Sequence, residues 1–255
     1  MDTVRIESQG PVTTVRLHRP DARNAFNEVL IAELTQAFGS IPASARVVVL
    51  AGEGNAFCAG ADVSWMKKSK DYTEEENARD AAAMAAMLRA IDECPKPVLA
   101  RVNGPALGGG SGLVAACDIA IAAETSMFGF TEVRLGIMPA VISTFVLPKV
   151  GLRAARRYFL TGERFGAREA LAMGLVHEVV APDALDAKVQ AITGELLQCG
   201  PRAVESAKKL LREVAGQTRD QAIDHTVRAI ARLRVTPEAQ EGLGAFLEKR
   251  KPNWS

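Results

Sequence analysis

Short apolar segments rich in β-branched residues alternate with longer amphipathic segments over the first 150 residues. The short segments have the length and composition of strands. They span residues 4–7, 12–17, 47–52, 98–104 and 118–124. Two longer segments, 27–41 and 73–94, place apolar residues at helical spacing. Asn27 is a suitable cap for the first, and Thr73 with Glu76 forms a capping-box pattern for the second. This alternation predicts an α/β fold.

Helical patterns dominate the chain after residue 150. They cover residues 154–163, 167–176, 183–199, 202–215, 219–234 and 237–250. One expected strand, 176–180, interrupts them. Because no Ser/Gly-rich linker separates the two regions, we expect a core over residues 1–195 that passes directly into a C-terminal helical region over 196–255.

The composition fits one large globular unit without a strong electrostatic field. Of 255 residues, 48% are hydrophobic, which is enough to fill a sizeable core. The 31 basic and 30 acidic side chains give a net charge of +1, which argues against binding to nucleic acid or an anionic membrane. The N-terminal segment lacks a signal-peptide pattern, and no apolar run has membrane-spanning length. We therefore expect a cytoplasmic protein with no membrane partner.

The four cysteines have no spacing that suggests a shared structural role. Cys58, Cys94, Cys117 and Cys199 are far apart in the sequence. This pattern favours buried free thiols over a disulfide framework or a zinc site, so we expect no metal.

The three histidines and one serine in the glycine-rich segment are the remaining candidates for nucleophilic or acid-base chemistry. His18, His177 and His225 belong to no catalytic motif, which favours structural roles. Ser111 follows three glycines but has no identifiable base, so we do not expect a covalent nucleophile.

Two glycine-bearing segments each follow an expected strand: "GEGNAFCAGAD" (52–62) and "GGGSG" (108–112). Neither has the spacing of a phosphate-binding or dinucleotide-binding loop, because no Lys-Ser/Thr follows and the glycines do not match. A tight turn is the simplest interpretation of one such segment. Two of them in one fold favour a pair of backbone N–H groups directed at one oxygen, which is an oxyanion hole. A helix that begins at the glycine run would strengthen it.

The sequence resembles the crotonase superfamily, which comprises the enoyl-CoA hydratases and isomerases. Several motifs carry the resemblance in order along the chain. They are "RPDARNAFN" (19–27), "NAFCAGAD" (55–62), "NGPALGGGSGLVAACDIAIA" (103–122), "FGFTEVRLGIMP" (128–139), "YFLTGERFGAREALAMGLVHEVV" (158–180) and "FLEKRKPNW" (246–254). The resemblance implies a crotonase-like spiral of strand-strand-helix turns with a C-terminal helical trimerisation region.

The resemblance also implies where the substrate binds. The backbone N–H groups of Ala59 and Gly109 match the family's two donors to the thioester oxygen. The positions that resemble the coenzyme A surface are Ala22, Arg23 and the segment Ala59, Gly60, Ala61 and Asp62. Lys249, near the C-terminus, matches a region that approaches coenzyme A, in some members from a neighbouring subunit. Coenzyme A is part of the substrate, and no other cofactor is expected.

The family's hydratases commonly carry two catalytic glutamates, and this sequence retains one. Glu132 matches the second glutamate, whereas Gly112 stands at the position of the first. The apolar residues around Glu132 are expected to desolvate its carboxylate and raise its pKa toward neutrality. They are Phe128, Phe130, Val133, Leu135 and Ile137.

The resemblance implies reversible hydration of an enoyl-CoA, with a homotrimer or homohexamer as the assembly. Within the family, "FTEVRLGIMPAVIS" and "GGGSGLVAACDIAIA" are most like bacterial 3-methylglutaconyl-CoA hydratases of leucine degradation, whose reverse reaction dehydrates 3-hydroxy-3-methylglutaryl-CoA. We expect Gly112 to leave room for a branched acyl group and to remove one negative charge. Two alternatives remain: a double-bond isomerase, which needs only one glutamate, and a non-catalytic acyl-CoA- or RNA-binding protein.

Overall fold

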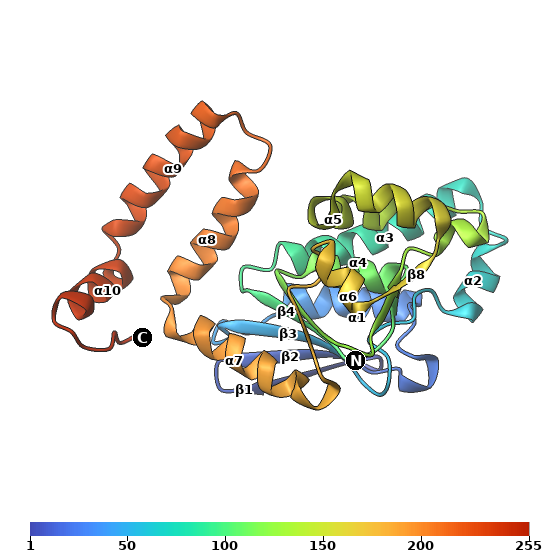
Figure 1. Ribbon diagram of the computed structural model, residues 1–255, viewed down its shortest axis with the longest axis horizontal. Helices are drawn as coiled ribbons and strands as arrows, with labels where there is room; N and C mark the ends of the chain where they lie inside the picture. Colours follow the sequence, from blue (N-terminus) through green and yellow to red (C-terminus); the bar gives the residue numbers. More distant parts are fainter. Residues whose placement is uncertain (255) are drawn as a thin grey trace.

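A six-stranded sheet forms the centre of the molecule (Figure 1). The computed structural model describes residues 1–254. The strand order is β1 (Val4–Gln9), β2 (Val12–Leu17), β3 (Val47–Gly52), β4 (Val98–Val102), β6 (Ile119–Ala123) and β9 (Glu178–Val180). β1 and β2 pair antiparallel, and the other neighbours pair parallel. All six strands that the alternation predicts are confirmed.

Helices cover both faces of this sheet. The larger core cluster joins one face to α1 (Glu28–Gly39), α3 (Glu74–Asp92), α4 (Gly109–Ala116) and α5 (Ala140–Thr161). α7 (Leu185–Gln198) packs on the opposite face. The expected caps are confirmed: the Asn27 side chain accepts from the N–H of Leu30 at 2.9 Å, and Thr73 and Glu76 form a capping box.

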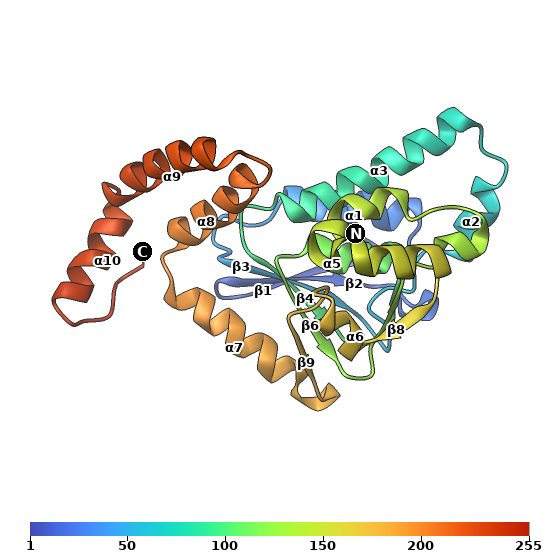
Figure 2. The same ribbon diagram turned by 45° about the horizontal axis from the view of Figure 1, so that its top comes forward.

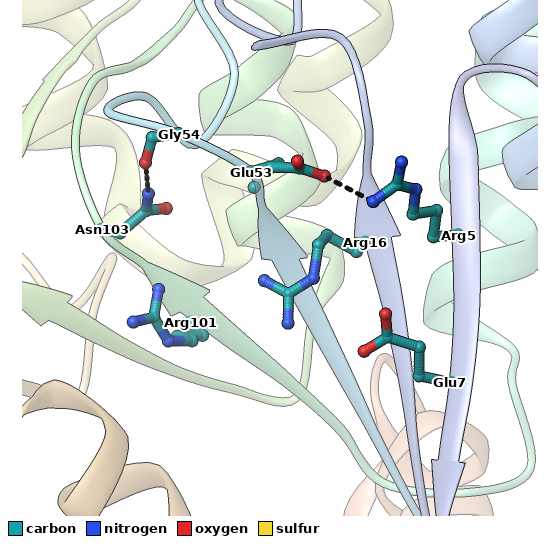
Figure 3. Close-up of a pocket in the computed structure, with 8 residues that line it drawn as sticks. Arg5, Glu7, Arg16, Glu53, Gly54, Arg101 and Asn103 are labelled. Atoms are coloured by element: carbon teal, nitrogen blue, oxygen red, sulfur yellow. Dashed lines mark hydrogen bonds and ion pairs between the residues drawn. The ribbon is translucent and has the colours of Figure 1, made fainter.

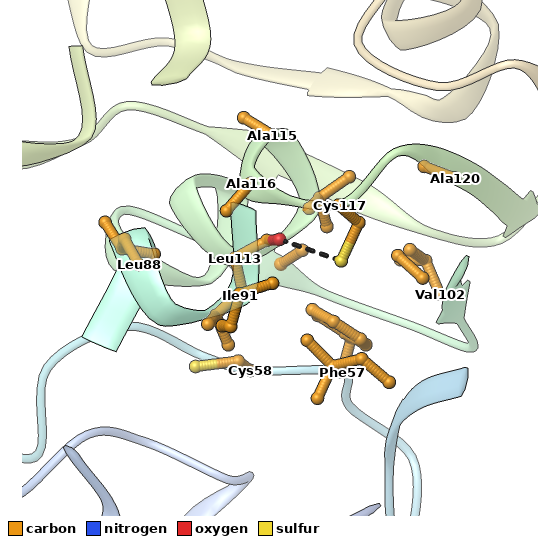
Figure 4. Packing of buried hydrophobic residues seen from close by; sticks show 14 of the residues in the cluster. Phe57, Cys58, Leu88, Ile91, Val102, Leu113, Ala115, Ala116, Cys117 and Ala120 are labelled. Carbon is orange, nitrogen blue, oxygen red and sulfur yellow. Dashed lines mark hydrogen bonds between the residues drawn. The ribbon is translucent and has the colours of Figure 1, made fainter. Parts of the chain in front are cut away.

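β3 contributes side chains to the apolar core on both faces of the sheet. All of its residues are buried, which is typical of a parallel strand with helices on both sides. Val48 and Leu50 belong to the larger cluster, and Val47 and Val49 pack toward α7. Figure 4 shows part of the larger cluster, in which Phe57 and Cys58 lie close to α3 and α4.

Three short strands form a second sheet that the sequence pattern does not predict. They are β5 (Ala106–Leu107), β7 (Met127–Gly129) and β8 (Arg164–Gly166), in that order. Strands of two or three residues are too short to show a period. Two short helices, α2 (Val63–Ser69) and α6 (Ala167–Ala172), flank the core.

α5 begins well before the expected helix at residue 154. Its first half contains Pro148, and Gly151 has φ 69° at a kink inside the helix. A proline and a glycine with positive φ usually mark the end of a helix. The local sequence therefore does not predict that the chain is helical on both sides of this bend.

The last three helices form a C-terminal arm, defined here as α8 (Pro201–Val214), α9 (Arg219–Arg234) and α10 (Pro237–Leu247). The arm lies beside the sheet layers in both views (Figures 1 and 2). α8 is attached by Lys208, whose Nζ is 2.6 Å from Asp118 Oδ2 and donates to Lys96 O at 3.0 Å. Among residues 1–254, no helix is long and apolar enough to cross a membrane.

Three of the four cysteines are buried as expected, but Cys199 is exposed, so the expectation is wrong for that residue. Cys199 follows the last residue of α7 at the junction with the C-terminal arm, where the packing against the sheet ends. Burial raises the pKa of the Cys58 thiol to about 12 and raises the pKa of Cys94 and Cys117.

We expect Asp118→Ala to lower the free energy of unfolding by about 2–3 kcal/mol, measured by urea denaturation. The Asp118 carboxylate accepts from the N–H of Val98 at 2.7 Å as well as from Lys208, so its loss leaves two donors without this partner. Glu163→Ala, which breaks the exposed pair with Arg157, is the control and should have a much smaller effect. Equal losses for the two variants would contradict the assignment.

Candidate active site

The two glycine-bearing segments meet at the end of the sheet. Cys58 forms a parallel bridge with Ala106, and the N–H of Leu107 donates to Cys58 O at 3.0 Å. The backbones are so close that a Cβ on Gly110 would lie 2.3 Å from Cys58 O. A glycine is therefore required at position 110 by the close approach of the two segments. The expectation that the segments come together is confirmed.

Gly109 is the first residue of α4, so its N–H has no carbonyl partner within the helix. The preceding Gly108 has φ 51° and ψ −119°, and its N–H donates to Gly129 O at 2.8 Å. This bond fixes the turn that presents the start of α4. Phe26 and Met84 lie against the Gly109 Cα, where a Cβ would be 2.8 Å and 2.6 Å from their side-chain atoms.

The N–H of Ala59 already has a protein partner: it donates to Arg23 O at 3.0 Å. A substrate oxygen must therefore share or replace that acceptor. Arg23 and Asn24 both have left-handed backbones, with φ of 50° and 55°. The buried Asn24 side chain donates to Glu53 O and Ala56 O at 2.9 Å each, which holds the strained turn in place.

The residues expected to contact coenzyme A lie on two adjacent segments. Phe26 and Ala61 form a parallel bridge, with Phe26 N–H donating to Gly60 O at 2.7 Å. This bridge brings the turn that contains Ala22 and Arg23 beside the segment from Ala59 to Asp62.

Asp62 has a structural role in this arrangement. Its carboxylate accepts from Ser64 N at 2.7 Å at the start of α2 and pairs with Arg19 at 2.8 Å. Burial alone would raise the pKa of Asp62, but the hydrogen bonds from Arg19, Ser64 and Trp65 outweigh it and hold the pKa below its usual value. Asp62 therefore stays ionised and ties the two segments together.

Glu132 begins a short 3-10 helix, Glu132–Leu135, just after β7. A Cβ on Gly108 would lie 3.1 Å from Glu132 Oε1, so the carboxylate lies directly beside the turn that starts α4. Its Oε2 is buried and has no hydrogen-bond partner within residues 1–254. Burial raises the pKa of Glu132 above its usual value. The expected direction of this shift is confirmed.

The expected cause of that shift is only partly right. Phe128 and Phe130 are fully buried, as expected. Leu135, the last residue of the 3-10 helix, and Ile137, just beyond it, are 58% and 60% exposed. The expectation that these two residues belong to the buried apolar surroundings of the carboxylate is therefore wrong.

Gly112 does not leave open space. A Cβ at this position would lie 2.5 Å from Ile142 Cγ2, and Ile142 is 2% exposed. The volume that a longer side chain would need is therefore filled from α5. The expectation that Gly112 leaves room for a branched acyl group is wrong, because its space belongs to the α4–α5 contact.

The other residues considered for chemistry have structural partners. Ser111 is buried and donates to Ala106 O at 2.6 Å. His18 pairs with Glu53, His225 lies 3.0 Å from a Glu213 oxygen, and His177 accepts from Ala120 N at 3.1 Å. Within residues 1–254, no cluster of three or more His, Cys, Asp or Glu side chains could hold a metal ion.

Lys249 is not brought to the site within one chain. It follows α10 at the end of the C-terminal arm, and α10 lies at the opposite end of the molecule from α2 (Figures 1 and 2).

Sequence reasoning missed the residues that position the site, above all Asn24 and Arg19. The sequence signal for Asn24 is the segment "RNAF", in which this polar residue directly precedes two apolar ones. The segment matches no recognisable turn motif.

Known proteins resemble the chain over nearly its whole length. A family model described as enoyl-CoA hydratase/isomerase matches residues 7–255. A crotonyl-CoA hydratase of Syntrophomonas wolfei is 34% identical over 99% of this chain and 98% of its own. A short-chain-enoyl-CoA hydratase of Clostridium acetobutylicum is 34% identical over 98% of this chain and 97% of its own. The crystal structure of an enoyl-CoA hydratase from Shewanella pealeana has a TM-score of 0.95 and 41% identity over 99% of this chain and 96% of that one.

We expect Gly112→Ala to lower the free energy of unfolding by about 1–3 kcal/mol, because the new methyl group overlaps Ile142. The matched control is Gly194→Ala in α7, where a Cβ meets no atom within 4 Å and helix propensity favours alanine. Ile142→Ala in the Gly112→Ala background should cost less than it does alone, measured by a double-mutant cycle. Additive effects would contradict the contact.

Proposed function

Because the chain belongs to the enoyl-CoA hydratase/isomerase family, whose members act on acyl-CoA thioesters, we propose that it catalyses the reversible hydration of an enoyl-CoA. One observation carries the proposal for the site. The carboxylate of Glu132 lies beside Gly108, and its Oε2 is buried with no hydrogen-bond partner within residues 1–254. This is the environment of a group that exchanges protons.

The backbone N–H of Gly109 supplies the electrostatic part of the reaction. It donates to the thioester oxygen, which becomes an enolate oxygen as negative charge develops. A donor of this kind lowers the barrier by roughly 3 kcal/mol. Ala59 supplies the second donor once its N–H shares the thioester oxygen with Arg23 O.

Glu132 then acts as the only acid-base residue. In the hydration direction, its carboxylate takes a proton from water while the water oxygen bonds to the β-carbon and electrons move to the thioester oxygen. The protonated Glu132 next gives that proton to the α-carbon, and the carbonyl reforms. Dehydration is the reverse: Glu132 removes the α-proton and returns it to the departing hydroxyl, which leaves as water.

For the acyl group, we propose 3-methylglutaconyl-CoA, with 3-hydroxy-3-methylglutaryl-CoA as the hydrated partner in leucine degradation. The support is electrostatic. With Gly112 and Ile142 at the α4–α5 contact, this wall of the site carries no second carboxylate. A substrate with its own distal carboxylate meets less repulsion there than in a site with two glutamates.

A double-bond isomerase is the second candidate, because one glutamate can move a proton between two carbons. Turnover in ¹⁸O-labelled water separates the two reactions. Hydration places the label in a 3-hydroxyacyl product, whereas isomerisation moves the double bond without incorporating oxygen. Turnover that depends on Glu132 would exclude a non-catalytic acyl-CoA- or RNA-binding role.

We propose further that the chain assembles into a homotrimer or homohexamer through its C-terminal arm. The support is the large apolar side chains that the arm exposes in a single chain. They include Val227, Val235, Leu243, Phe246 and Leu247. Apolar surface gathered on one element is typical of a protein–protein contact.

We expect Glu132→Gln to reduce kcat at least ~100-fold while acyl-CoA binding and the circular dichroism spectrum stay unchanged. The amide has the same size but cannot take up the proton. Glu195→Gln, at an exposed position on α7, is the control and should turn over like the parent. Normal turnover in the Glu132 variant would remove this residue from the mechanism.

The pH profile of kcat/KM should fall on the acidic side through a pKa above 4.5, the usual value for glutamate. Burial favours the neutral carboxyl, so the carboxylate base is lost at a higher pH than in an exposed glutamate. Residual activity of Glu132→Gln should lack this limb. The same limb in the variant would assign the titration to another group.

The parent should favour 3-methylglutaconyl-CoA over crotonyl-CoA by at least ~10-fold in kcat/KM, which corresponds to about 1.4 kcal/mol. Gly112→Glu with Ile142→Ala introduces a second carboxylate with space for it and should reduce this preference. Gly112→Gln with Ile142→Ala is the neutral control of the same size. A parent that prefers crotonyl-CoA would refute the substrate and leave hydration intact.

A further inference from the structure

Three arginines lie in one row across four neighbouring strands of the main sheet. Arg5 on β1 is directly opposite Arg16 on β2, Arg16 is in register with Ala51 on β3, and Ala51 is in register with Arg101 on β4. Residues in register point to the same face, so the row alternates long cations with one small side chain. Figure 3 shows the three guanidinium groups around one hollow.

Most of this row lies where α7 does not cover the sheet, and only the first turn of α7 reaches it, through the pair between Asp186 and Arg101. α7 packs on Val47, Val49 and Leu99, which precede Ala51 and Arg101 on the same face of β3 and β4. The uncovered part forms a cavity of about 480 Å³. Its lining is Arg5, Glu7, Arg16, Gly52, Glu53, Gly54, Arg101 and Asn103.

The carboxylates around the cavity form close ion pairs with the two outer arginines, whereas Arg16 interacts with Asp186 only at longer range. Glu53 lies 3.7 Å from Arg5 and also contacts His18, and Asp186 pairs with Arg101 at 2.5 Å. Glu7 lines the same cavity. Within residues 1–254, no carboxylate lies within 4.0 Å of the Arg16 guanidinium.

The Arg5–Arg16 juxtaposition does not itself favour folding. Like charges directly opposite each other on paired strands are destabilising, and Arg5 faces Arg16 in this way. Strands lie about 4.8 Å apart, so Arg16 and Arg101 are about 10 Å apart at the backbone, and both side chains line the same cavity. Planar guanidinium groups that line one cavity suit a multidentate oxyanion.

We propose that this arginine row binds a phosphate dianion carried by a small polar molecule. The cavity is larger than a free phosphate needs, and its walls are polar or charged, so a phosphate monoester with a hydroxylated body fits it better than an acyl chain. Arg16 makes the central contact, with Arg5 and Arg101 on either side. The site lies on the sheet face opposite α4 and Glu132.

The test is isothermal titration calorimetry of the full chain with inorganic phosphate and, separately, with glycerol 3-phosphate. We expect both to bind the parent, the monoester more tightly, and Arg16→Gln to weaken binding at least ~10-fold. Arg153→Gln, at an exposed arginine on α5, is the matched control and should bind like the parent. No binding by the parent at millimolar phosphate, or equal binding by Arg16→Gln, would overturn the proposal.

Thermal unfolding gives an independent readout that separates binding from screening. Phosphate should raise the Tm of the parent more than sodium chloride of equal ionic strength does, and this difference should vanish in Arg16→Gln and Arg5→Gln. Because both substitutions relieve a like-charge contact, the variants should fold. Equal effects of the two salts on the parent would show screening alone and overturn the proposal.

Two further measurements separate this site from its alternatives. Gly54 lines the cavity and packs against Pro20, which lies near the segment expected to bind coenzyme A. The first measurement therefore compares KM for crotonyl-CoA in the parent and in Arg16→Gln. An unchanged KM is expected, and a raised KM would assign the row to the acyl-CoA site. The second measurement is the sedimentation coefficient, which should be the same for the parent and Arg16→Gln. A smaller assembly in Arg16→Gln would instead assign the arginine row to a contact between copies of the chain.

Discussion

The close backbone contact between the Cys58–Gly60 segment and the start of α4 determines where every element of the site lies. Two glycines permit it, Gly110 against Cys58 O and Gly60 against Leu107 O, and a third, Gly108, lies beside the Glu132 carboxylate. A side chain at any of them would separate the two segments or displace the acid. The Glu132 carboxylate lies beside Gly108, the residue that precedes Gly109 at the start of α4. The geometry of the candidate site is therefore a consequence of backbone packing.

This contact needs rigid support, because hydrogen bonds to a developing oxyanion are effective only when the donors are already in place. Asn24 provides part of that support by joining a left-handed turn to the loop after β3. Asp62 and Arg19 hold the other side of the same turn. The surroundings of Glu132 are different, since its Oε2 has no protein partner within residues 1–254 and burial raises its pKa. The candidate site therefore combines a rigidly held backbone with a carboxylate whose Oε2 has no hydrogen-bond partner within the described residues.

The sequence predicts those parts of the structure that depend on local pattern. Strand periods and caps such as Asn27 are local signals, and the glycine segments and Glu132 stand in ordered motifs, so the sequence alone indicates all of them. The failures concern contacts between distant elements. Ile142 fills the space at Gly112 from another helix, and nothing near residue 112 indicates it. The arginine row depends on the register of four strands, and Arg5 and Arg101 carry no signal of their common position.

The pair Gly112 and Ile142 changes how the absence of a second glutamate should be understood. A glycine at that position seen in sequence suggests a missing side chain and an empty space. The structure shows instead that α4 and α5 pack through the position, with Ile142 nearly inaccessible to solvent. A glutamate introduced alone would have to displace a packed apolar side chain and bury a second charge near Glu132, and both effects oppose folding. In the proposed mechanism, the single carboxylate is therefore a consequence of how α4 and α5 pack, and a second acid at position 112 would require both helices to change together.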